Sequence, residues 1–207
     1  MRRIRIVVAY DGTNYCGWQV QKNGETIESV LNRAIGELTG EEIHVMGSSR
    51  TDAGVHACGN VAVFDTEARM AADKFSYALN QRLPEDIRIQ DSCEVPADFH
   101  PRFQKTVKTY EYRILNREFP LPAYRFNSHF TYRKLDVERM RQAAAYLIGE
   151  HDFQSFCAAG AQVKTTVRTI YALDVEKQGD LIILRITGNG FLYNMVRIIA
   201  GTLMKIG

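Results

Sequence analysis

The stretch Gly47-Ser48-Ser49-Arg50-Thr51-Asp52-Ala53-Gly54-Val55-His56-Ala57 lies between two runs of strand-forming residues, 43–46 and 60–64. A guanidinium, a carboxylate and a turn-forming glycine therefore share one loop. A nearby cation typically lowers the pKa of an aspartate by about 1–3 units, so we expect Arg50 to hold Asp52 ionised. An ionised carboxylate on a tight loop can act as nucleophile, general base or metal ligand. The alternative is that Asp52 and Gly54 only form the turn and that Arg50 is solvated.

The composition is that of an ordinary globular chain. It has 207 residues, 45% of them hydrophobic, and a formal net charge of +2. So small a charge gives no global attraction for nucleic acid, and any such binding has to rest on local clusters. The N-terminus has no apolar leader, and no apolar run approaches the length of a membrane span. We therefore expect a soluble, cytoplasmic protein with no membrane partner.

The spacing of cysteine and histidine predicts neither a disulfide framework nor a metal site. The four cysteines form no CxxC pair, and the five histidines form no HxH or HxxxH pair. We expect reduced cysteines that pack inside a cytosolic protein and no metal centre built by the protein.

The first half of the chain alternates strand and helix patterns. Residues 4–10 alternate as a half-buried strand, and residues 27–38 carry apolar side chains at helical spacing. A second helix is expected at 75–83 and a further strand at 87–95. With the runs on either side of the central loop, the order is strand, helix, strand, strand, helix, strand, which is a mixed α/β half.

A run that interleaves aromatic and basic residues closes this half, namely Phe99-His100-Pro101-Arg102-Phe103-Gln104-Lys105, and Lys108 continues it. It is the densest candidate in the sequence for a surface that contacts phosphates. A solvated linker between two halves is an equally good interpretation.

The second half repeats the style of the first. In a strand at 106–114, Lys108, Tyr110 and Tyr112 fall on one face. Two tyrosines on one face usually mark the edge of a core, but they also offer a platform for a flat base. A helix is expected at 137–148, and a hairpin follows, with strands at 166–176 and 181–187 joined across Gln178-Gly179-Asp180.

The last segment, 191–203, is apolar on most faces and predicts a largely buried helix. Arg197 lies near its middle, where an unpaired guanidinium would be very unfavourable. Breaking a buried ion pair costs roughly 3–5 kcal/mol, so we expect a carboxylate partner, and Asp52 is the candidate by context. The alternatives are that Arg197 reaches the surface or pairs with Asp174 or Glu176.

Several motifs in a fixed order carry a resemblance to a known family. They are Tyr10-Asp11-Gly12 with Tyr15 and Gly17-Trp18-Gln19; Arg50 to Ala57; Leu79-Asn80 with Leu83-Pro84; Phe99-His100 with Arg102-Phe103; Lys108-Thr109-Tyr110-Glu111-Tyr112; His151-Asp152-Phe153 with Phe156; Thr166-Val167-Arg168; and Phe191 with Met195-Val196-Arg197. Over essentially its whole length the chain resembles the TruA family of tRNA pseudouridine synthases.

The resemblance implies an enzyme that isomerises uridine to pseudouridine at positions 38–40 of the tRNA anticodon stem-loop, as a homodimer and without a cofactor. It implies that Asp52 is the nucleophile, that Tyr110 packs against the uracil and that Arg197 pairs with Asp52. Attack at C1′, attack at C6 and formation of a glycal all remain open for the carboxylate.

The expected substrate contacts extend beyond these three residues. The resemblance implies that Arg50 stabilises the flipped-out base, and Tyr112 is expected beside Tyr110. Phosphate contacts are expected from Arg102 and Lys108, with Lys105, Lys164 and Arg168 as further basic candidates.

The expected fold class is α+β. We expect two similar mixed α/β halves, ferredoxin-like or RRM-like, at 1–104 and 105–207. They would share a continuous, mostly antiparallel sheet with helices on one face and a central RNA-binding cleft. Members of the family usually continue for some tens of residues past the arginine helix, so we expect this sequence to end short of the family's closing segment.

Two other classes of function fit parts of the pattern. A non-catalytic RNA-binding module would keep the basic and aromatic residues without needing both Asp52 and Arg197. A glycosidase-like hydrolase would need a second carboxylate as acid, and none stands out in the sequence. Turnover on tRNA and a product of unchanged mass separate the synthase from both.

Overall fold

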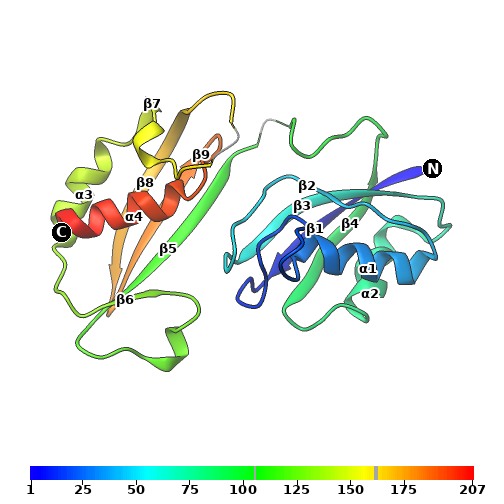
Figure 1. The fold of residues 1–207 in the computed structure, drawn as a ribbon, viewed down its shortest axis with the longest axis horizontal. Helices are drawn as coiled ribbons and strands as arrows, with labels where there is room; N and C mark the ends of the chain where they lie inside the picture. Colours follow the sequence, from blue (N-terminus) through cyan, green and yellow to red (C-terminus); the bar gives the residue numbers. More distant parts are fainter. Residues whose placement is uncertain (105, 161–162) are drawn as a thin grey trace. The chain divides into compact units, whose positions relative to one another are not determined.

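The computed structural model describes residues 1–104, 106–160 and 163–207 (Figure 1). The chain divides into two compact units, Met1–Gln104 (unit 1) and Lys105–Gly207 (unit 2), and each is described by itself. No helix in the described ranges is long and apolar enough to cross a membrane.

Unit 1 is a four-stranded antiparallel sheet with two helices. Its elements are β1 (Arg2–Tyr10), α1 (Ile27–Thr39), β2 (Met46–Gly47), β3 (Ala57–Thr66), α2 (Phe75–Asn80) and β4 (Ile87–Val95), with a 3-10 turn at Ala72–Lys74 before α2. The strand order is β2-β3-β1-β4, so β1 is central and pairs on both sides. The register places Tyr10, the last residue of β1, opposite Ala57, the first residue of β3. The end of β1 therefore lies beside the loop that precedes β3.

The core of unit 1 follows from the alternation in β1. Ile4, Ile6 and Val8 are buried and share one cluster with apolar residues of α1 and α2, whereas Arg3 and Arg5 point to the other face. On that other face Arg3 donates from Nη2 to Asp65 Oδ2 at 2.7 Å. Both helices thus cover one face of the sheet, and ion pairs occupy the opposite face.

Helix α1 begins and ends where the sequence predicts. The buried Thr26 caps it, because its hydroxyl accepts from Ser29 N at 3.2 Å while Ser29 Oγ accepts from Thr26 N at 3.0 Å. This reciprocal pair satisfies two of the backbone donors that a helix start leaves open. Gly40 ends the helix with a φ of 75°, a conformation that glycine adopts without steric cost.

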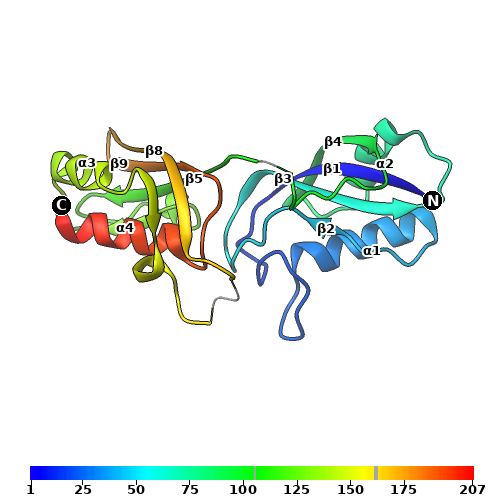
Figure 2. The same ribbon diagram turned by 90° about the horizontal axis from the view of Figure 1, so that it is seen from above.

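Unit 2 is a five-stranded sheet, also with two helices. Its elements are β5 (Lys108–Asn116), β6 (His129–Thr131), α3 (Val137–Ala145), β7 (Gly149–Asp152), β8 (Val167–Gln178), β9 (Leu181–Gly188) and α4 (Met195–Ile206), with 3-10 turns at Pro122–Tyr124 and Gln154–Phe156. The strand order is β6-β5-β9-β8-β7, and all pairs are antiparallel except β5 with β6. Figures 1 and 2 show α3 and α4 against this sheet, and their buried residues share one cluster with Ile182, Leu184 and Ile186 of β9.

Most of the predicted elements are confirmed, including the strand at 4–10, the strand at 87–95 and the hairpin of β8 and β9. The described strand pairs form one sheet within each unit, and the expectation that the two sheets continue into one another stays a prediction. Three of the four edge strands, β2, β6 and β7, have only two, three and four residues and offer few backbone groups for further pairing, whereas the fourth, β4, has nine. The central cleft stays a prediction.

Two boundaries differ for local reasons. The strand expected at 43–46 is reduced to Met46–Gly47, because Val45 N donates at 2.8 Å to the side chain of Asn32 on α1 instead of to a strand. The helix expected to reach residue 148 ends at Ala145, because Leu147 N bonds back to Ala144 O, three residues earlier, at 3.0 Å. Such tightened last turns are common at helix ends.

We predict that Ile6→Ala lowers the free energy of unfolding by about 2–5 kcal/mol, since it opens a cavity at a fully buried position of the central strand. Urea unfolding measures this loss. Val7→Ala is the matched control, because the half-buried Val7 is the next residue of the same strand and faces away from the core. Equal losses for the two variants would contradict the assigned faces of β1.

Candidate functional site

The loop between β2 and β3, which contains Asp52, is fixed at its start by Asn60 of β3. This asparagine is only 5% exposed. Its Oδ1 accepts from Ser48 Oγ at 3.0 Å and from Ser49 N at 3.3 Å, and its Nδ2 donates to Ser49 O at 3.0 Å. One side chain thus binds the Ser48 hydroxyl and both backbone polar groups of Ser49, so the start of the loop has a defined path.

Asp52 opens a tight turn. Val55 N donates to Asp52 O at 3.1 Å, and Gly54, the third residue of this turn, has a φ of 74°. A positive φ at that position is typical of a type II turn and favours glycine. The turn interpretation is therefore confirmed, and the half-buried Asp52 side chain starts from a backbone of fixed geometry.

A second loop, residues 11–18 between β1 and α1, holds this turn in place. Trp18 N donates to Thr51 O at 3.0 Å, and Gly54 N donates to Tyr15 O at 3.3 Å. Asp52 lies between these two anchor points. Gly17 permits the approach, because a Cβ at this residue would lie 2.6 Å from Thr51 O.

The hydroxyl of Tyr10 makes a further contact to the turn. It lies 2.7 Å from Thr51 Oγ1, and both side chains are buried. On the other side of the turn, His56 Nδ1 lies 2.9 Å from Asp11 Oδ1 and 3.2 Å from Gly12 N. The pKa of Asp11 is lowered, chiefly because the Thr13 hydroxyl donates to its carboxylate and secondarily because His56 is near.

Two of the predicted cations lie together in unit 1. Arg102 donates from Nε to Gly47 O at 3.0 Å, which ties it to the start of the Asp52 loop. Burial lowers the pKa of the Arg102 guanidinium, and the charge of Arg50 lowers it further. Arg50 itself is exposed. Two like charges held close together form a local positive centre of the kind that a phosphate neutralises.

Lys105, a further candidate for phosphate contact, lies outside the described residues. Phe103, two positions earlier in the sequence, is 81% exposed and stacks on His100, with 4.2 Å between the ring centroids.

Unit 2 carries the predicted tyrosines on β5. Tyr110 and Tyr112 are half-buried on the face of the sheet that packs against the core. The ring of Tyr110 meets Phe191 edge-on, with centroids 5.0 Å apart. Burial raises the pKa of Tyr112, and the charge of Arg197 opposes this shift. The structure therefore brings Tyr112 close to Arg197, and Tyr110 against the segment that leads into α4. Lys108, at the start of β5, is half-buried.

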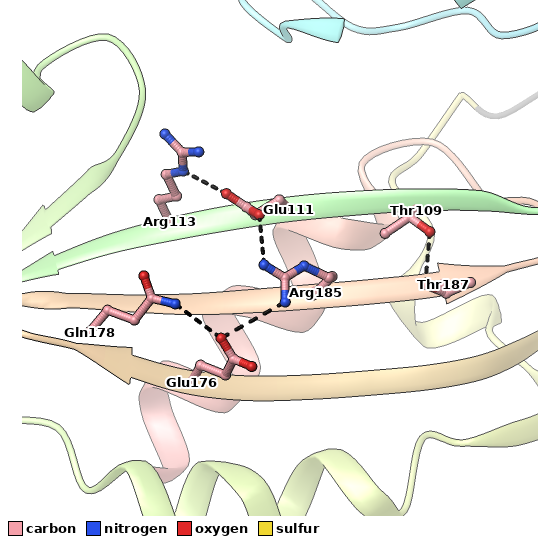
Figure 3. Close-up of polar contacts among 7 residues, drawn as sticks. All are labelled: Thr109, Glu111, Arg113, Glu176, Gln178, Arg185 and Thr187. Carbon is pink, nitrogen blue, oxygen red and sulfur yellow. Dashed lines mark hydrogen bonds and ion pairs between the residues drawn. The ribbon is translucent and has the colours of Figure 1, made fainter. Parts of the chain in front are cut away.

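Figure 3 shows the opposite face of the same sheet, with α4 behind the strands. Glu111 of β5 accepts from Arg113 Nε at 2.7 Å and from Arg185 Nη2 at 3.1 Å, and Thr109 Oγ1 lies 2.9 Å from Thr187 Oγ1. The hydrogen bond from Arg113 is the main reason why the pKa of Glu111 is lowered. The alternation along β5 thus separates an aromatic face from a charged one.

The premise of a largely buried helix around Arg197 is wrong. Helix α4 begins at Met195 rather than Phe191, and it buries one side only, through Met195, Ile199, Ala200 and Leu203. Arg197 lies on the other side and is exposed. Its charge is therefore not trapped in the core, and burial supplies no argument for its partner. Asn194, with a φ of 57°, precedes the helix and is the only non-glycine residue with positive φ among those described.

The candidate residues thus fall into two sets. Arg50, Asp52 and Arg102 belong to unit 1, and Lys108, Tyr110, Tyr112 and Arg197 belong to unit 2. The pairing of Asp52 with Arg197 stays a prediction. Among the described residues, no group of three or more His, Cys, Asp and Glu side chains is placed to hold a metal ion.

The sequence interpretation missed the residues that hold the Asp52 turn. Asn60, Tyr10 and Thr51 act through contacts between segments far apart in the chain, which periodicity does not reveal. The glycines at 12 and 17 were a signal, since glycine in a loop often marks a close backbone approach.

Comparison with known proteins gives a consistent result. The family described as tRNA pseudouridine synthase matches residues 6–104 and 143–207. The chain is 49% identical over 207 residues to tRNA pseudouridine synthase A of Acetivibrio thermocellus, covering 100% of this chain and 85% of that protein. It is 50% identical over 208 residues to the protein of the same name from Ruminiclostridium cellulolyticum, again covering 100% and 85%. For the protein of that name from Citrifermentans bemidjiense, the identity is 48% over 207 residues, covering 100% and 83%.

We predict that Gly17→Ala destabilises unit 1 more than Gly40→Ala does. Both glycines have positive φ, so both variants bear the backbone strain of about 1–2 kcal/mol. Only at Gly17 does the new methyl also meet a backbone atom, the Thr51 carbonyl oxygen, whereas nothing lies within 4 Å at Gly40. Urea unfolding of the two variants measures the difference, and equal losses would show that the two loops can separate without cost.

Proposed function

Because this chain belongs to the tRNA pseudouridine synthase family, we propose that it isomerises uridine to pseudouridine in tRNA, at positions 38–40 of the anticodon stem-loop. The observation that carries the proposal is the family match over 6–104 and 143–207, which includes the Asp52 loop, together with the way two other segments hold that loop. The family match supports the reaction, and a carboxylate on a turn of fixed geometry supports the nucleophile that we assign below.

The reaction changes the attachment of the uracil without adding or removing atoms. The bond between N1 and C1′ breaks, a bond between C5 and C1′ forms, the proton at C5 is lost and N1 gains one. No net oxidation or hydrolysis takes place, so the proposal requires no cofactor. We assign the nucleophile to Asp52, whose backbone is fixed on both sides by Trp18 and Tyr15. Attack at C1′, attack at C6 and glycal formation all use the same carboxylate.

The target base has to leave the helical stack before the carboxylate can reach it. We propose that Tyr110 packs against the flipped uracil, with Tyr112 beside it. The T-shaped contact to Phe191 supports this role, because it restrains the ring of Tyr110. Arg197 is proposed to pair with Asp52 when the site is assembled, and its place on the side of α4 away from the core is compatible with that role.

Cations in both units are proposed to bind the RNA. Arg50 is assigned to the flipped base, and Arg102 and Lys108 are assigned to phosphates. The anchoring of Arg102 to Gly47 O supports its assignment, because it fixes a charge beside the Asp52 loop. We further propose that the enzyme acts in the cytoplasm as a homodimer, as the family resemblance implies.

Asp52→Asn is predicted to abolish turnover while tRNA binding is retained. The amide is isosteric but is a far weaker nucleophile than a carboxylate. The measurement is tritium release from tRNA labelled at C5 of uridine, and binding is followed by filter retention. Asp73→Asn is the control, because Asp73 is an exposed carboxylate of unit 1 that pairs with Lys74 on the surface. Release of tritium by Asp52→Asn would refute the assignment.

Arg102→Ala is predicted to reduce the dependence of tRNA binding on salt. Each lost phosphate contact lowers the slope of log K against log salt concentration by about 0.7–0.9. Titrations between low and moderate salt measure the slope. Arg82→Ala is the matched control, since Arg82 is an exposed arginine of unit 1 whose Nη1 donates to Ala78 O of α2. An unchanged slope for Arg102→Ala would remove this residue from the RNA interface.

A further inference from the structure

Tyr10 is the last residue of β1, and its side chain is directed into the core. The residue is 5% exposed, and its ring lies against Trp18, with 5.9 Å between the centroids. Its hydroxyl reaches Thr51 Oγ1 at 2.7 Å, across 41 positions of sequence. Thr51, 9% exposed, is the residue immediately before Asp52.

We propose that Tyr10 is a positioning residue, which aligns the Asp52 carboxylate for reaction through its hydrogen bond to Thr51. The inference rests on the proposed role of Asp52 as nucleophile. Tyr10 itself is not assigned any contact with the substrate.

Thr51 is held by two hydrogen bonds, one at its backbone and one at its side chain. Its carbonyl oxygen accepts from Trp18 N at 3.0 Å, and its hydroxyl is bound by Tyr10 at 2.7 Å. A threonine fixed at both its backbone and its side chain cannot rotate without breaking one of the two bonds. The peptide that joins it to Asp52 therefore has a fixed direction, which is set by a residue of the central strand.

The precision of this direction matters for the chemistry. Catalytic groups have to stay within about 0.5 Å of the productive geometry, and a misplacement of about 1 Å can cost about a hundredfold in rate. A loop alone does not give such precision. A hydroxyl carried on the packed end of β1 extends the rigidity of the core to the residue next to Asp52.

The chain provides a matched control in Thr66 of β3, which is 1% exposed. Its hydroxyl donates to Glu41 Oε2 at 2.6 Å, so Thr66→Val also removes a hydrogen bond of a buried side chain in unit 1. That bond does not lead to Thr51, because the register places Thr66 opposite Arg2, at the other end of β1 from Tyr10. A general loss of stability would affect both variants, whereas a loss of alignment would affect Tyr10→Phe alone.

The experiment compares Tyr10→Phe, Thr51→Val, the double variant, Thr51→Ser and Thr66→Val in the full chain, by tritium release from C5-labelled tRNA, filter binding and urea unfolding. We expect kcat to fall about 3- to 10-fold in Tyr10→Phe and Thr51→Val, the range that one neutral hydrogen bond of about 0.5–1.5 kcal/mol allows. KM and tRNA binding should stay within about twofold. The double variant should be no slower than either single variant, because both remove the same bond. Thr51→Ser, which keeps the hydroxyl, should retain kcat, as should Thr66→Val.

Equal kcat in Tyr10→Phe and Thr66→Val would overturn the inference, as would additive losses in the double variant. Asp52→Asn, assayed beside them, distinguishes a failure of the positioning role of Tyr10 from a failure of the nucleophile assignment. If it is inactive while Tyr10→Phe keeps full kcat, only the positioning role fails. If Asp52→Asn turns over, the assignment of the nucleophile fails first.

Discussion

The hydrogen bond from Trp18 N to Thr51 O is the constraint on which the Asp52 loop depends. It joins two loops of unit 1 at a distance that leaves no room for a side chain at Gly17. Trp18 is in turn fully buried, so the contact is set by the core and not by the loops themselves. The position of the proposed nucleophile is therefore a property of the packing of β1 and α1.

The sequence predicted the elements whose formation depends on local patterns. Alternation identified β1, helical spacing and the stop at Gly40 identified α1, and the turn at Gly179 identified the β8–β9 hairpin. These signals come from neighbouring residues, so a single chain displays them. The turn at Asp52 was predictable for the same reason, and the family resemblance turned that loop into a specific chemical hypothesis.

Contacts between distant segments could not be predicted. The bonds that Asn60 and Tyr10 make to the Asp52 loop join parts of the chain that no periodicity connects. The error on Arg197 has a related cause. Apolar content suggested burial on all sides, but α4 packs only one side, and the choice of side depends on the sheet it meets. The pairing of Asp52 with Arg197 and the Tyr110 contact with uracil rest on the resemblance and on chemistry.

The charged face of the unit 2 sheet, opposite the face that carries Tyr110, bears a row of charged side chains on β5, β9 and β8 (Figure 3). The net charge of this row decides whether it can attract RNA. Arg113 and Arg185 are offset there by Glu111 and Glu176, and the register adds Asp174 opposite Arg185. The row therefore carries more negative than positive charge, and a polyanion gains no attraction from it. Under the proposed function, this row is therefore not expected to compete for RNA with the side of the sheet that carries Tyr110.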